Sequence, residues 1–161
     1  MSSSGELGKV DAAEPKLDHA LSTALSQHEP RDINLAYHLL ADSALMRGDP
    51  RLAERLYAHS LRWAIAHGDE VRAYIEVEGL AMAAAGQSRP AKALRLAGAA
   101  TAHSEALGSH ITAVFWEELK HRYLGKARQA LGAEVAAMSM KQGEQTEFRE
   151  AVAYALDVQR D

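Results

Sequence analysis

Glu118 and His121 form the one Glu-x-x-His motif in this chain. This spacing places a carboxylate and an imidazole on the same face of a helix. Helical bundles that hold two metal ions use two such motifs together with two further glutamates. Because there is no second copy, we interpret the motif as a surface pair and predict no metal site.

Nucleophilic catalysis by a Ser or a Cys needs that residue beside a base, and the sequence shows no such arrangement. It has no Cys and no Gly-x-Ser-x-Gly elbow. Two of its eight His precede a Ser, at His59-Ser60 and His103-Ser104. Adjacent residues of a helix point about 100° apart and do not face each other. We therefore predict no catalytic residue and a chain that is not an enzyme.

The bulkiest side chains are Trp63, Phe115 and Trp116. We interpret them as packing residues, with a ligand wall or a dimer contact as the alternative.

The composition and charge of the chain argue against several classes of function. The chain has 161 residues, a net charge of −4 and 47% hydrophobic residues. A mildly acidic chain lacks the overall charge of a nucleic-acid binder, and no apolar run approaches the ~20 residues of a membrane span. We expect a soluble, cytoplasmic protein without a cofactor, direct nucleic-acid binding or membrane contact.

The sequence contains a partial internal repeat with an offset of 40 residues. Residues that recur are Leu40-Ala41 as Leu80-Ala81, Pro50 as Pro90, Ala53 as Ala93, Leu56 as Leu96 and Gly68 as Gly108. Repeats of this length are typical of stacked helical hairpins, which usually act by binding. We predict an all-α fold of stacked antiparallel hairpins with a closing C-terminal helix, in a single domain over 14–161 after a disordered tail at 1–13.

Pro, Asp and Gly residues predict where the helices begin and end. The predicted segments are a short helix from Pro15 to before Pro30, then helices from Asp32 to Arg47, from Pro50 to Gly68, from Asp69 to Ala85, from Pro90 to Gly108, from Ile111 to Leu131 after a Ser109 cap, from Ala133 to Lys141, and a last one from about Thr146 through Leu156.

The first hairpin resembles a tetratricopeptide repeat. Its matching residues are Tyr37, Leu40, Ala41, Gly48-Asp49, Ala53, Tyr57 and Leu61. The second hairpin departs from that motif, with Ser88 where a turn Gly is usual and Ala97 in place of the aromatic residue. The resemblance implies a tetratricopeptide-like superhelix with lengthened repeats.

Later segments resemble the C-terminal helical arm of bacterial ATP-binding regulators of the LuxR type. They are Glu78–Ala81, Arg95–Ala100, Glu105–Gly108, Ala127–Gly132 and Glu150–Leu156. The resemblance implies a part in sensing an inducer or a partner and relaying it. ATP hydrolysis and DNA binding are not carried over, because the chain has no phosphate-binding loop and stops about where a DNA-binding domain would begin.

By the tetratricopeptide register, the first helix of each hairpin lines a groove. The predicted groove residues are His38, Asp42, Met46, Glu78, Met82, Glu118 and Arg122. A groove of carboxylates, an imidazole and soft apolar groups suits a basic peptide or a small polar cation; a solvated helix face is the alternative.

We therefore predict a non-enzymatic interaction or sensor domain that binds a peptide, a protein or a small effector in bacterial transcriptional regulation or signalling. One alternative is a small-molecule-binding or catalytic bundle with a buried His–Glu pair in an internal cavity. Another is a dimerisation module, with apolar residues on the outer helices at Leu17, Leu21 and Leu25 or at Val152 and Leu156.

Overall fold

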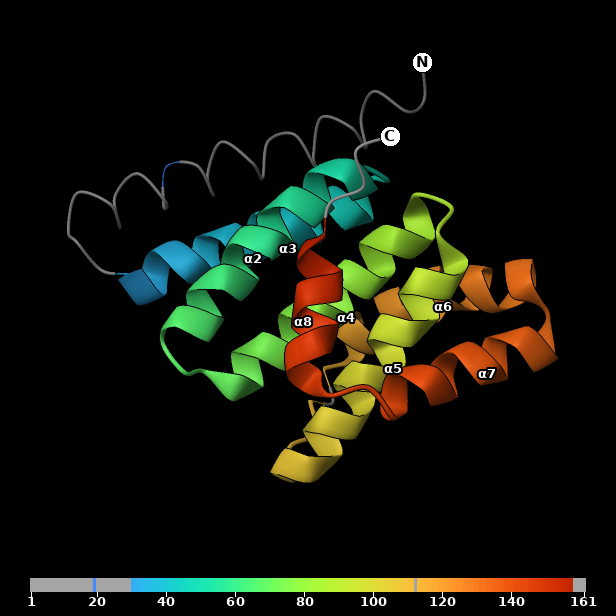
Figure 1. Ribbon diagram of the computed structural model, residues 1–161. Coiled ribbons are helices and arrows are strands. Elements are labelled where there is room, and N and C mark those ends of the chain that lie inside the picture. The colour runs from blue at the N-terminus through green and yellow to red at the C-terminus, as the bar shows by residue number, and fades with distance from the viewer. Residues whose placement is uncertain (1–18, 20–29, 112, 158–161) are drawn as a thin grey trace, which may run out of the picture.

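The computed structural model describes residue 19 and the ranges 30–111 and 113–157 (Figure 1). Within these residues the protein is all-α, which confirms the predicted fold class. The helices are α2 (Pro30–Met46), α3 (Pro50–Ala66), α4 (Glu70–Gly86), α5 (Pro90–Leu107), α6 (Val114–Leu131), α7 (Ala133–Glu144) and α8 (Phe148–Leu156). The predicted tail at 1–13 and all but one residue of the predicted helix after Pro15 lie outside the described residues.

The internal repeat of the sequence corresponds to two hairpins with matching bounds. Helices α2 and α4 begin 40 residues apart, and so do α3 and α5. The Asp49 and Asp69 carboxylates accept hydrogen bonds from the backbone of α3 and α4, as expected of helix caps. Three-residue turns follow α2, α3 and α4, and each turn has a residue of positive φ in the middle. The ends of these helices and the tight turns between them therefore follow from local sequence signals.

Two predicted caps are wrong. Asp32 lies within the first turn of α2, because that helix already begins at Pro30. Ser109 does not cap α6, which begins at Val114 after Ala113. The Ser109 hydroxyl instead lies 2.9 Å from the Tyr74 hydroxyl. Helix α6 begins four residues later than the 40-residue repeat predicts.

Helix α4 is the centre of the fold. Nearly every residue from Ala73 to Ala84 is buried, which is typical of a helix covered on all sides. It contacts α3 and α5, its neighbours in sequence, and also α6 and α2 (Figure 1). Helix α8, red in the figure, packs on α5 and α4. The two glutamates within this stretch, Glu76 and Glu78, are consequently buried.

Helices α5 and α7 touch backbone to backbone. A Cβ atom on Gly98 would lie 2.1 Å from the Met140 carbonyl oxygen, and one on Gly143 would lie 1.9 Å from the Arg95 carbonyl oxygen. Neither backbone atom can move away without moving its helix. The two glycines thus fix α7 against α5, and Met140 of α7 is held beside the pocket described below.

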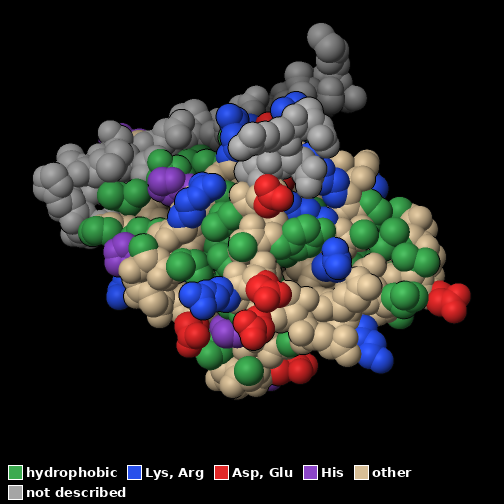
Figure 2. Space-filling view, in the orientation of Figure 1, with side chains coloured by type: hydrophobic (Ala, Val, Ile, Leu, Met, Phe, Trp, Pro, Cys, Tyr) green, Lys and Arg blue, Asp and Glu red, His purple; other side chains and the backbone are tan. Residues whose placement is uncertain are grey.

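The surface carries charges of both signs. On the face shown in Figure 2, Lys and Arg side chains are interspersed with Asp and Glu, and neither sign forms a continuous patch. None of the described helices combines the length and the apolar character needed to cross a membrane.

Candidate functional site

A buried polar cluster joins α2, α3 and α4, and we call it the His38 network. The His38 Nδ1 atom lies 2.6 Å from Glu76 Oε1, and its Nε2 atom lies 3.3 Å from Asp42 Oδ2. Tyr57 donates a 2.6 Å hydrogen bond to the other oxygen of Asp42. One histidine is thereby held between two carboxylates from different helices.

The network is sealed from solvent. Glu76 is fully buried, and His38 and Asp42 are each less than 10% exposed. Arg72, one turn before Glu76 on α4, places a guanidinium nitrogen 3.7 Å from the same carboxylate. Gly79 makes room for the Tyr57 ring, because a Cβ atom there would lie 2.7 Å from Tyr57 Cδ1.

Burial and charge shift the titration of these groups. Burial by itself lowers the pKa of His38, but the hydrogen bond to Glu76 and the charges of Glu76 and Asp42 outweigh it, so the pKa is raised above 6.5. Burial raises the pKa of Asp42, although His38 and Tyr57 oppose the shift. Burial and the neighbouring Asp42 also raise the pKa of Tyr57 well above its ordinary value. The network is therefore most stable with His38 protonated.

Trp116 of α6 connects the His38 network to a second cluster, which is formed by Glu78, Lys120 and Glu117. Its ring centroid lies 5.6 Å from that of His38, and its indole nitrogen donates a 3.2 Å hydrogen bond to Glu78 Oε1. Lys120 donates a 2.7 Å bond to the other oxygen of Glu78 and lies 3.3 Å from Glu117. Burial lowers the pKa of Lys120, but these bonds and charges more than compensate and raise it. Glu78 thus has both oxygens occupied by protein donors.

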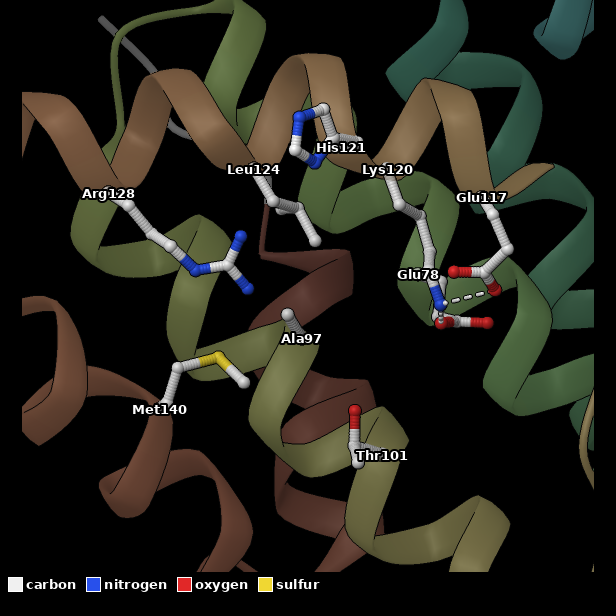
Figure 3. Close-up of a pocket in the computed structure, with 9 residues that line it drawn as sticks. All are labelled: Glu78, Ala97, Thr101, Glu117, Lys120, His121, Leu124, Arg128 and Met140. Atoms are coloured by element: carbon white, nitrogen blue, oxygen red, sulfur yellow. Dashed lines mark hydrogen bonds and ion pairs between the residues drawn. The ribbon is translucent and has the colours of Figure 1, made fainter. Parts of the chain in front are cut away.

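Glu78 and Lys120 also line a pocket of about 450 Å³ (Figure 3). Its walls come from α4, α5, α6 and α7, and its residues are Glu78, Ala97, Thr101, Glu117, Lys120, His121, Leu124, Arg128 and Met140. In Figure 3 the Arg128 guanidinium points into the space above Ala97 and Met140, at the opposite end from Lys120. The pocket is of a size that suits a small ligand or a short peptide segment.

The seven predicted groove residues do not form one surface. Three of them, His38, Asp42 and Glu78, are buried and belong to the two connected clusters. Met82 is fully buried in the core, and Met46 is exposed at the end of α2. Glu118 and Arg122 are exposed and do not line the pocket. The opposite face of α6 meets α4: Trp116 and Lys120 contact Glu78, and Glu118 and Arg122 point about 200° away from them.

Two of the three carboxylates that favoured a basic ligand are already paired inside the protein, and the third, Glu118, lies outside the pocket. Asp42 accepts from Tyr57 and faces His38, while Glu78 accepts from Trp116 and Lys120. A buried carboxylate with internal donors has little remaining attraction for an external cation. The expectation of a basic peptide or small cation therefore loses its physical basis.

Sequence reasoning missed Glu76, Lys120 and Arg128 as members of the site, and it interpreted Trp116 as a packing residue with a ligand wall as the alternative. One signal was available for Glu76. Glu76 and Glu78 are followed by an uncharged run from Gly79 to Ser88, and charges inside a buried apolar helix need partners. No comparable local signal distinguished Lys120 or Arg128 from ordinary helix residues.

A catalytic bundle requires a buried His–Glu pair in an internal cavity. The pair exists as His38 and Glu76, but neither residue lines the pocket of Figure 3. In the part of the chain that the structure describes, no three His, Asp or Glu side chains are placed to hold a metal ion.

Comparison with known proteins adds no relative: the chain matches no protein-family profile, no curated protein and no solved structure.

Proposed function

We propose that this chain is a non-enzymatic binding domain built from tetratricopeptide-like helical hairpins, and that the pocket between α4 and α7 receives its partner. The partner is a peptide segment of a protein or a small effector. By the resemblance of its helices to the arm of LuxR-type ATP-binding regulators, the domain serves in bacterial transcriptional regulation or signalling.

The observation that carries this proposal is the pocket of about 450 Å³ with walls from four helices. Charged and hydroxyl groups line it beside apolar ones, and this combination both orients a ligand and desolvates it. The best-formed acid–base pair, His38 and Glu76, lies outside its lining. The arrangement therefore favours binding over bond-breaking chemistry.

The contacts around Glu78 supply a physical route for a relay. A ligand that drew Lys120 away would leave one oxygen of Glu78 without its 2.7 Å donor. Glu78 also holds Trp116, whose ring lies against His38 of the buried network. Such contiguous contacts can couple a pocket to the packing of α2 against α4 and α6. Trp116 fluorescence should change on ligand binding, and should change less in the Glu78→Gln variant.

Mass spectrometry tests whether the pocket is the binding site. The native mass of the purified chain would be compared with its denatured mass, for the wild type, Thr101→Trp and Ala106→Trp. Thr101 is exposed and lines the pocket, so a Trp there fills it, whereas Ala106 is exposed on the same helix outside it. A retained ligand should appear in the wild type and Ala106→Trp and be lost in Thr101→Trp.

Equal retention by all three proteins would place the ligand elsewhere and contradict the proposal. If the wild type retains nothing, no small effector is held tightly enough to survive purification. The same three proteins would then be compared for binding to a displayed peptide library, where only Thr101→Trp should lose the selected peptides.

One observation favours homodimerisation as a second role. Helix α2 exposes Leu35, Leu39 and Met46, each between 41% and 47% accessible. Exposed apolar side chains on one helix are a common dimer contact. A concentration-dependent dimer in sedimentation experiments that disappears in Leu39→Glu would support this role, and a monomer at high concentration would exclude it.

A further inference from the structure

The charges that line the pocket differ in how far the protein itself neutralises them. Lys120 lies between two carboxylates, at 2.7 Å from Glu78 and 3.3 Å from Glu117. Arg128 and His121 also line the pocket, and among the described residues neither side chain has an ion-pair or hydrogen-bond partner. At the Lys120 end two carboxylates face one ammonium, so the unpaired positive charge of the pocket is that of Arg128 at the other end.

The surroundings of Arg128 strengthen its attraction for an anion. Its guanidinium points over Ala97 and Met140, with Leu124 on the same wall (Figure 3). Apolar neighbours reduce the water around a bound ligand, so an ion pair formed there is stronger than one on an open surface. A planar guanidinium matches a carboxylate with two parallel hydrogen bonds.

The pocket is also long in one direction. Its α6 wall runs from Glu117 to Arg128, which at 1.5 Å per residue is about 16 Å. That length corresponds to about five residues of extended peptide. An elongated ligand would place one end beside Arg128 and the other beside Lys120 and its two carboxylates.

From these three observations we propose that the pocket binds a carboxylate at its Arg128–His121 end, carried by an elongated ligand whose apolar middle lies over Ala97 and Leu124. This assignment rests on the proposed binding function. The same carboxylate could belong to the end of a peptide or to a free carboxylic acid, and the experiment distinguishes these two sources.

Isothermal titration calorimetry of the full chain would use four probes. They are the acetylated pentapeptide Ala-Leu-Ala-Leu-Glu with a free carboxyl end, its amidated Ala-Leu-Ala-Leu-Gln counterpart, the basic Ala-Leu-Ala-Leu-Lys amide, and octanoate as a free carboxylic acid. We expect the acidic peptide or octanoate to bind, and the amidated neutral and basic peptides to bind at least about tenfold more weakly. Binding of octanoate without the acidic peptide identifies a free acid as the source, and the reverse identifies a peptide.

Variants then locate the carboxylate. Arg128→Gln should weaken binding of the successful probe about tenfold or more, and His121→Gln should weaken it to a smaller extent. Arg149→Gln is the matched control, because Arg149 is exposed on α8 and does not line the pocket; its affinity should stay within about twofold of the wild type. All three positions are exposed, so none of these variants removes a core contact.

Three results would overturn the carboxylate assignment. They are unchanged affinity in Arg128→Gln, preference for the basic peptide, and no binding of either acidic probe at millimolar concentration. If the basic or neutral peptide binds the wild type and Thr101→Trp abolishes that binding, the pocket still has its proposed binding function and only the charge of the ligand was wrong. Failure of the proposed function itself would appear as binding that Thr101→Trp leaves intact.

Discussion

His38 and Glu76 belong to different hairpins, 38 residues apart, and their side chains lie 2.6 Å from each other in the core. Neither residue could stay charged there alone, because an isolated buried charge costs several kcal/mol. Asp42 and Arg72 complete the charge balance on either side. The contact between α2 and α4 is therefore partly ionic and should respond to pH.

The stability of the protein should fall as pH rises above 6.5. The folded-state pKa of His38 is raised above the ordinary 6.5, so its stabilising contribution is complete below 6.5 and is lost as pH rises through the higher folded value. The raised pKa of Asp42 also makes the stability fall as pH rises, but over a range of lower pH. Urea unfolding between about pH 6 and 9 should show this decline in the wild type and a flatter profile in His38→Gln. An exposed His110→Gln variant is the control, and a wild-type slope in His38→Gln would contradict the prediction.

Replacing Tyr57 by Phe should lower the free energy of unfolding by about 1–3 kcal/mol. The change removes the 2.6 Å hydrogen bond to Asp42 and leaves a buried carboxylate oxygen without a donor. Tyr37→Phe is the matched control, since the Tyr37 ring stacks on His59 and its hydroxyl has no hydrogen bond within the described residues. Its effect should stay within about 0.5 kcal/mol. Equal effects of the two substitutions in chemical denaturation would argue against a structural role for the Tyr57–Asp42 bond.

Adding one methyl group at Gly98 should destabilise the fold by about 3 kcal/mol. The new Cβ atom would lie 2.1 Å from the Met140 carbonyl oxygen, so α7 has to move away from α5. Gly125→Ala tests the same substitution in α6, where no atom lies within 4 Å of the added Cβ. That variant should gain up to about 1 kcal/mol, because Ala favours a helix more than Gly does. Thermal and urea unfolding would measure both, and a harmless Gly98→Ala would mean that the two helices are less closely packed.

Ser88→Gly should stabilise the protein by about 1 kcal/mol. Ser88 has φ of +62° in the turn between α4 and α5, at the place where the preceding turns have Gly48 and Gly68. A left-handed conformation strains a residue with a Cβ atom, and Gly relieves that strain. The reciprocal Gly48→Ser variant should lose a similar amount of unfolding free energy. If Ser88→Gly destabilises instead, the Ser88 side chain makes a compensating contact in the turn.

The sequence predicted the helices more accurately than the site. Pro50 and Pro90 begin α3 and α5, Asp49 and Asp69 cap α3 and α4, and Gly108 ends α5, all as expected from their types. These features depend on a few adjacent backbone groups, which is why sequence patterns predict them. The wrong Ser109 cap shows the limit, since the Ser109 hydroxyl lies beside Tyr74, 35 residues away.

The sequence by itself determined the all-α class, the 40-residue spacing of two hairpins and most helix ends, because each follows from local backbone and capping preferences. Only the tertiary structure decided which side chains meet. On α6, Trp116 and Lys120 lie one turn apart and both meet Glu78 of α4. Glu118 and Arg122, two residues further along from each of them, point about 200° away and are exposed. The resulting pairing of Glu78 left Arg128 and His121 as the pocket residues without an internal partner among the described residues.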